Sequence, residues 1–168
     1  MKLRHLLITC MALACTFFSA CHNAPKTNVE KIDDLKKQLE SDAKTLKDLE
    51  TTDFVTLHED FMSCDSMLQY LRPEQLEETF QKLQLVQAYL EQFKETAPVM
   101  KADMDSTLRQ LDRLKADAET HYLSDSLVAV YLDAETQFVV LTNNRISYFQ
   151  ERFANCRKDM KALKKNLK

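Results

Sequence analysis

The sequence predicts an all-α protein, an elongated antiparallel three-helix bundle with coiled-coil-like packing. The 168-residue chain has no glycine and only three prolines, whereas strand-rich folds place glycine in hairpins and bulges. Leu, Lys, Glu, Gln, Asp and Ala dominate the composition, and most of these are good helix formers. Apolar residues recur at alternating gaps of three and four over long stretches, which is the spacing of one helix face.

Residues 1–20 have the three parts of an export signal. Lys2 and Arg4 form a basic start, an uncharged apolar run spans 6–18, and two small residues follow it. The apolar run is 13 residues long, whereas a helix that spans a bilayer needs about 20. This segment is therefore predicted to be a signal peptide that is removed, and not a permanent transmembrane helix.

Residues 18–21 (Phe-Ser-Ala-Cys) resemble the lipobox of bacterial lipoproteins, in which the cysteine becomes the mature amino terminus and is acylated through its sulfur. The match holds at the last three positions and departs at Phe18, where the family usually carries an aliphatic residue. The resemblance implies a lipid anchor on Cys21 and a tether over 21–28. His22 stands where some lipoproteins carry the Asp that retains them in the inner membrane, which favours the outer membrane. An ordinary secretory signal with a chance cysteine is the alternative.

The first predicted helix begins near Val29 and ends before Pro73. Its apolar positions form two runs, and the second run has the alternating gaps of a heptad pattern. The polar residues 51–53 separate the runs. They are interpreted as a local disturbance of one helix, although they could instead cap a new helix. The two runs are Ile32, Leu35, Leu39, Leu46 and Leu49, then Phe54, Leu57, Phe61, Cys64, Leu68 and Leu71.

The second predicted helix begins at Pro73, a residue that suits the first turn of a helix, and extends to about residue 120. Its apolar spacing continues unchanged on both sides of Pro98. This continuity favours one long helix with a kink at the proline over a reversal of the chain. If the chain instead breaks at 51–53 and at 98, the bundle consists of four to five shorter helices.

The third predicted helix begins at about Asp125, with Ser124 as its N-cap, and extends to about residue 166. Residues 127–141 are apolar on more than one face, which predicts that this helix is the most deeply buried of the three. The chain thus divides into a signal peptide at 1–20, a lipidated tether at 21–28 and one helical domain at 29–168.

Cys64 and Cys156 are the cysteines that remain after signal removal and lipidation. Both occupy apolar heptad positions, and thiols outside the cytoplasm tend to pair, so a disulfide between them is predicted. In an ideal three-helix hairpin the two residues are displaced by about 10 Å along the axis. A disulfide tolerates a Cα separation of about 7 Å. The bond therefore requires a stagger of the helices, and two buried free thiols are the alternative.

Charge is unevenly distributed along the chain. Residues 145–168 carry eight Lys or Arg against two acidic residues, whereas the mature chain before them is acidic, which disfavours broad nucleic-acid binding. Cations in the last turns complement the negative end of a long helix. They could also contact an anionic partner such as peptidoglycan, lipopolysaccharide or an acidic protein. The residues in question are Arg157, Lys158, Lys161, Lys164, Lys165 and Lys168.

In plan the chain resembles the murein lipoprotein family, which is also lipidated, helical and poor in glycine. In that family a terminal lysine is joined to peptidoglycan, and Lys168 is the matching residue. The resemblance does not extend to the sequence, since that family is much shorter and trimerises through a strict heptad. It implies, as an alternative function, attachment to the cell wall through the basic end.

The sequence carries no recognisable catalytic or cofactor motif. A glycine-rich phosphate loop cannot form without glycine, and neither the His-Glu-x-x-His of zinc peptidases nor the Glu-x-x-His pairs of di-iron bundles occur. We therefore expect no cofactor and no metal. The predicted function is that of a non-enzymatic lipoprotein of the cell envelope, held to a membrane by lipid, that serves as a helical spacer or binds a protein partner.

Overall fold

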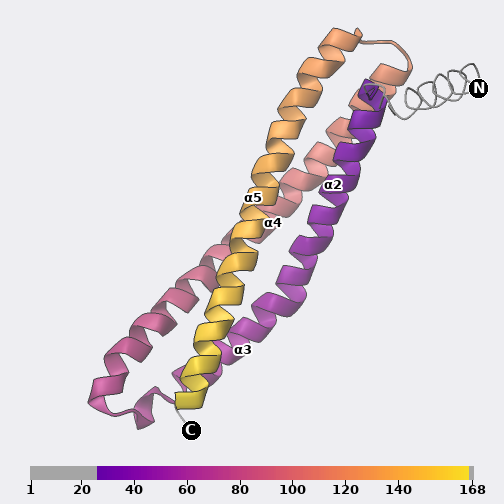
Figure 1. The fold of residues 1–168 in the computed structure, drawn as a ribbon. Coiled ribbons are helices and arrows are strands. Elements are labelled where there is room, and N and C mark those ends of the chain that lie inside the picture. The colour runs from indigo at the N-terminus through magenta and orange to yellow at the C-terminus, as the bar shows by residue number, and fades with distance from the viewer. Residues whose placement is uncertain (1–25, 167–168) are drawn as a thin grey trace, which may run out of the picture.

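The computed structural model describes residues 26–166, which form an elongated bundle of three long helical elements (Figure 1). All regular elements within this range are helical, so the predicted three-helix, all-α bundle is confirmed. The first and third elements run in one direction, the second runs in the opposite direction, and each of the three packs against the other two. The elements are α2 (Asn28–Asp48), η2 (Leu49–Asp53), α3 (Phe54–Asp65), η3 (Leu68–Tyr70), α4 (Pro73–Glu119) and α5 (Asp125–Asn166).

A capping box starts α2. The Thr27 hydroxyl oxygen accepts a hydrogen bond from the backbone N–H of Glu30 at 3.2 Å, and the Glu30 carboxylate accepts one from the backbone N–H of Thr27 at 2.8 Å. These two bonds satisfy amide groups that the first turn of a helix leaves without intrahelical partners. The helix therefore begins within one residue of the predicted start.

The disturbance predicted at 51–53 is a π-helical turn, η2. The backbone N–H of Phe54 donates to the carbonyl of Leu49, five residues earlier. A π turn accommodates one extra residue, and this matches the gap of five between Leu49 and Phe54 in an apolar pattern otherwise spaced by three and four. The interpretation as one helix with a local disturbance is confirmed.

The first long element ends earlier than the heptad pattern indicated. α3 stops at Asp65, and a 3-10 turn, η3, follows before α4. Pro73 accounts for the extended conformation of Arg72 (φ −72°, ψ 151°), because a proline disfavours helical conformation in the residue before it, but it does not act as far back as Asp65. Leu68 still packs against the core from η3, so its apolar position is used without an α-helical backbone.

α4 continues through Pro98 as a single 47-residue helix, as the uninterrupted apolar spacing predicted. It ends in a Schellman motif, in which the His121 and Tyr122 amides donate to the carbonyls of Ala118 and Asp117 at 3.3 and 2.9 Å. His121 has φ 54°, a left-handed conformation in which glycine is usual, and this chain has no glycine to supply.

Ser124 then caps α5, as predicted. Its hydroxyl oxygen accepts a hydrogen bond from the backbone N–H of Leu127 at 3.4 Å. The connection between α4 and α5 is therefore short and hydrogen-bonded at both of its ends. It lies at the same end of the bundle as the start of α2 (Figure 1).

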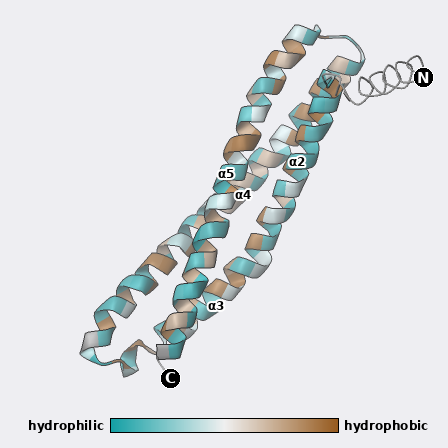
Figure 2. Cartoon of the chain, in the orientation of Figure 1, coloured by the Kyte–Doolittle hydropathy of each residue, from teal (hydrophilic) through white to brown (hydrophobic). Residues whose placement is uncertain are grey.

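An aromatic cluster joins the three long elements in the half of the bundle farther from the α4–α5 connection. The ring of Phe93 in α4 lies 5.7 Å from that of Phe54 in α3 and 5.0 Å from those of Phe149 and Phe153 in α5, between ring centroids. The two pairs with α5 are edge-to-face, a geometry that adds to the gain from burial. The remaining hydrophobic core consists of aliphatic, methionine and cysteine side chains, and hydrophobic residues recur along every helix (Figure 2).

Ion pairs border the interface between α2 and α4. Lys115 donates to both carboxylate oxygens of Asp33, at 2.7 and 2.9 Å. Exposed pairs of this kind contribute little stability individually. Their regular placement along the two antiparallel helices is nevertheless consistent with a single register. Lys36–Asp112 is another pair across this interface, and Lys101–Glu50 joins α4 to η2.

Candidate functional site

The predicted lipidation site Cys21 and the terminal Lys168 lie outside the described residues, as does the signal peptide. The described chain begins at Lys26, at the end of the bundle that carries the α4–α5 connection. The carboxy-terminal turns of α5 lie at the opposite end (Figure 1). The basic cluster is therefore separated from the start of α2 by the length of the bundle.

Cys64 and Cys156 are both buried, and both thiols are free in this structure. The rings of Phe54 and Phe153 lie 6.5 Å apart and mark one level on the parallel helices α3 and α5. Cys64 follows this level by ten residues and Cys156 by only three. The difference of seven residues corresponds to about 10 Å along the axis, so the stagger that a disulfide requires is not present.

The two thiols share a chemical environment that suppresses reactivity. Burial raises the pKa of Cys64, and it also raises the pKa of Cys156. A thiol with a raised pKa has less of the thiolate form that reacts with disulfides, oxidants and metals. In this structure Cys64 and Cys156 act as small apolar core residues.

The predicted basic cluster is divided between internal and exposed cations. The Arg157 guanidinium donates to a carboxylate oxygen of Asp53 at 2.7 Å, and Lys164 pairs with Asp60. The hydrogen bond to Asp60 raises the pKa of Lys164. These two cations therefore attach α5 to the first helical element. Exposed members of the cluster are Lys158, Lys161 and Lys165.

The first half of α5 is not the best-buried helix segment, which corrects the prediction from its composition. Its apolar residues occupy two stripes, and the bundle covers only one. Val130 is 63% exposed, Tyr131 49% and Leu141 58%. A three-helix bundle offers α5 only two neighbours, so a second apolar stripe is left facing outward. The outer apolar face of α5, as we call it, consists of Leu127, Val130, Tyr131, Phe138 and Leu141, of which Phe138 is partly buried against the core.

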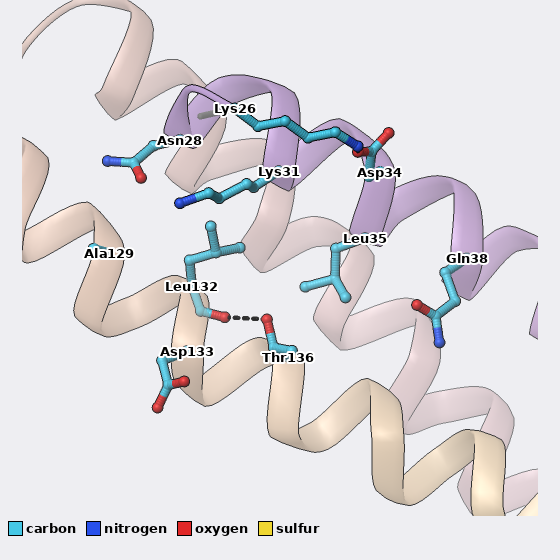
Figure 3. Close-up of a pocket in the computed structure, with 10 residues that line it drawn as sticks. All are labelled: Lys26, Asn28, Lys31, Asp34, Leu35, Gln38, Ala129, Leu132, Asp133 and Thr136. Atoms are coloured by element: carbon cyan, nitrogen blue, oxygen red, sulfur yellow. Dashed lines mark hydrogen bonds and ion pairs between the residues drawn. The ribbon is translucent and has the colours of Figure 1, made fainter. Parts of the chain in front are cut away.

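One groove beside this segment separates α5 from α2 (Figure 3). Leu35 and Leu132 provide its apolar floor, and both are buried. At its rim Lys26 pairs with Asp34. The hydrogen bond from Lys26 lowers the pKa of the Asp34 carboxyl and raises that of the ammonium. The charges of this groove are thus partly neutralised from within the chain.

A second groove lies on the other side of the segment, between α4 and α5. We call it the α4–α5 groove. Glu135 lines it from a position on the core side of α5, seven residues from Val128 and seven from Thr142, which are both buried. Burial raises the pKa of Glu135, and within the described residues its carboxylate forms no ion pair. The groove is lined by Gln110, Arg113, Leu114, Asp117, Leu123, Tyr131 and Glu135.

Asp42 is a buried polar residue that the sequence analysis did not single out. The side-chain amide of Asn143 donates to its Oδ1 at 3.0 Å, and its Oδ2 has no hydrogen-bond partner in the structure. Asp42 occupies the apolar position between Leu39 and Leu46, and the gap of seven between these leucines was the available signal. A single buried polar pair of this kind favours one register of α2 against α5.

No group of three His, Cys, Asp or Glu within residues 26–166 is arranged to hold a metal ion. Nor does any helix in that range combine the length and apolar character needed to cross a membrane. No protein-family model matches the sequence, and no match was found among curated proteins or solved structures. The candidate site is accordingly defined by geometry, as the outer apolar face of α5 with the α4–α5 groove beside it.

Proposed function

We propose that this protein is a non-enzymatic lipoprotein of the cell envelope, anchored through Cys21, whose helical bundle presents the outer apolar face of α5 to a protein partner. The observation that carries the binding role is the exposure of that face. Large apolar side chains gathered on a protein surface mark interaction sites. The residues beside the face include the buried Leu114 and a half-buried carboxylate, Glu135.

The arrangement of the chain ends supports the role of a spacer. The first described residues lie beside the start of α5, and α5 then extends over 42 residues to the opposite end. At 1.5 Å per residue this is about 63 Å. A lipid on Cys21 would hold the end that carries the outer apolar face near the membrane. The basic end would project away from it, toward the periplasm or the exterior.

An alternative function is attachment to peptidoglycan through the basic end. The observation in its favour is that Lys158, Lys161 and Lys165 are exposed at gaps of three and four, on one side of the last turns of α5. Against it, Arg157 and Lys164 already neutralise Asp53 and Asp60. Only part of the cluster is thus available to an anionic polymer.

Intact-mass analysis of the protein extracted from membranes tests the proposal, with cell-wall digestion as a parallel treatment. The expected result is a chain that begins at Cys21 and carries a diacyl or triacyl adduct. A Cys21→Ser variant should lose the adduct and leave the membrane fraction. An unmodified mature chain in the soluble fraction would overturn the lipoprotein assignment. A muropeptide adduct on Lys168 would establish the alternative.

A further inference from the structure

The outer apolar face of α5 has the spacing of a helix-packing seam. Leu127, Tyr131, Phe138 and Leu141 follow one another at gaps of four, seven and three, and Ala134 fills the gap of seven. This alternation of three and four is the pattern by which a second helix packs in parallel or antiparallel fashion. The seam spans 15 residues, or about 20 Å of helix. Its shape therefore suits another helix better than a loop or a small molecule.

The α4–α5 groove gives this seam a wall on one side. Tyr131 and Glu135 of α5 face Gln110, Arg113 and Leu114 of α4 across it. A helix placed in the groove would contact α4 and α5 together, as the fourth helix of a bundle does.

Charge restricts the helix that can bind there. Between residues 125 and 144, α5 carries Asp125, Asp133 and Glu135 and no lysine or arginine. Elsewhere the bundle supplies cations to its carboxylates, as Arg157 does for Asp53. Glu135 is half-buried, and although Arg113 of α4 lines the same groove, the two form no ion pair. A lysine or arginine brought by a binding partner would supply the missing opposite charge.

We propose that the α4–α5 groove binds an amphipathic helix of a partner protein, which places apolar residues on the outer apolar face and a lysine or arginine beside Glu135. A second copy of this chain fits less well through the same face, because α5 carries no lysine or arginine between residues 125 and 144 to place beside Glu135. The inference rests on the proposed binding role and adds the chemistry of the partner.

Synthetic peptides of about 18 residues, long enough to cover the seam, test this inference by fluorescence anisotropy. One peptide combines Leu at heptad spacing with Lys, and its matched control has the same Leu positions with Glu. The protein is the chain from residue 21 onward carrying Cys21→Ser, which contains every described helix. We expect saturable, one-to-one binding of the Leu/Lys peptide and binding of the Leu/Glu peptide that is weaker by about tenfold or more.

Substitutions then locate the binding site. Tyr131→Asp and Leu141→Asp should each weaken binding of the Leu/Lys peptide by about tenfold. Val55→Asp, at an exposed apolar residue of α3, should leave it unchanged. Glu135→Lys should shift the preference toward the Leu/Glu peptide, whereas Glu151→Lys, at an exposed site farther along α5, should not. Apart from half-buried Glu135 these are exposed sites, and circular dichroism establishes that each variant remains helical.

Binding that survives both Tyr131→Asp and Leu141→Asp would overturn the inference. So would sedimentation of the unmodified chain as a dimer that either substitution dissociates, since the face would then be covered by a second copy. These measurements use a chain without lipid. A negative result would therefore refute the proposal that a partner helix binds the α4–α5 groove. It would not bear on the lipoprotein assignment, which the intact mass of the membrane form tests separately.

Discussion

The state of the Cys64 and Cys156 thiols depends on how α3 is aligned along the bundle axis relative to α5. Both are buried and free, and their levels differ by about 10 Å. We expect a maleimide to label neither thiol in the native chain carrying Cys21→Ser, because burial both blocks access and raises their pKa values. Unfolding without reductant should yield two adducts by mass. Two adducts that form only after reduction would instead establish the disulfide predicted from the sequence.

Glu135 gives a pH-dependent test of the α4–α5 groove. Burial raises its pKa in the folded chain above the ordinary glutamate value, so folding favours the protonated form. Stability is therefore lost as pH rises from the ordinary value through the raised one, as the carboxyl ionises. Glu135→Gln should be more stable than the original chain at neutral pH, by no more than about 0.5 kcal/mol because the site is only half-buried.

The advantage of Glu135→Gln should vanish at acidic pH, where Glu135 is neutral in both the folded and the unfolded chain. Urea unfolding at the two pH values measures this difference. The matched control is Glu151→Gln on the exposed side of α5, which should show no dependence of this kind. Equal stabilities of the Glu135→Gln variant and the original chain at both pH values would show that burial does not penalise this carboxylate.

At the scale of the elements, the end of α4 lowers the stability of the fold, because a residue other than glycine occupies a left-handed position there. His121 takes the left-handed conformation of a Schellman motif, which costs a residue with a Cβ roughly 1–2 kcal/mol. Glycine removes this cost but loses more backbone entropy on folding. His121→Gly should therefore raise the free energy of unfolding by about 1 kcal/mol. Tyr122→Gly, at the next exposed residue, should not; thermal unfolding distinguishes the two variants.

Because the π turn η2 accommodates one extra residue, we expect a single-residue deletion within it to be tolerated better than a deletion elsewhere in the helix. Deleting Thr51 reduces the gap between Leu49 and Phe54 from five residues to four, so α-helical spacing would run through without a π turn. Deleting Thr45 from regular helix would rotate every later residue by about 100° and turn the core face of α3 away from α5. We expect cooperative thermal unfolding to persist after deletion of Thr51 and to disappear after deletion of Thr45. Similar losses from both deletions would refute this account of η2.

Most of the element boundaries could be predicted because they depend on local signals. The apolar spacing through Pro98, the cap at Ser124 and the disturbance at 51–53 all lie within a few residues of the structure that they determine. The end of α3 could not, because Leu68 and Leu71 continue the heptad pattern although the backbone has left the α-helix. At Leu68 the heptad pattern correctly indicated contact with the core, but it did not indicate which type of helix the backbone forms.

At the scale of the whole molecule, the candidate site could be recognised only in part. The sequence showed that residues 127–141 are apolar on more than one face, but a pattern does not say how many neighbours a helix has. In a three-helix bundle α5 has only two neighbouring helices, and these cover one of its two apolar stripes. The residues of the other stripe, which had suggested deep burial, are therefore exposed to solvent. Glu135 was missed for a related reason, since its core-side position matters only once the groove beside it is seen.

The two halves of the bundle should therefore differ in local stability. Along α5, residues 142–160 pack around the aromatic cluster of Phe93, Phe149 and Phe153, whereas residues 125–141 lie between two open grooves. Segments with fewer buried contacts open more readily.

Hydrogen exchange should show amides of 142–160 exchanging only through global unfolding, and those of 125–141 through local opening with a smaller free energy. The Leu/Lys peptide should raise protection in 125–141 and leave 142–160 unchanged. Uniform protection along α5 would mean that the outer apolar face is already as rigid as the core, and that a partner helix would have no loosely held segment to stabilise.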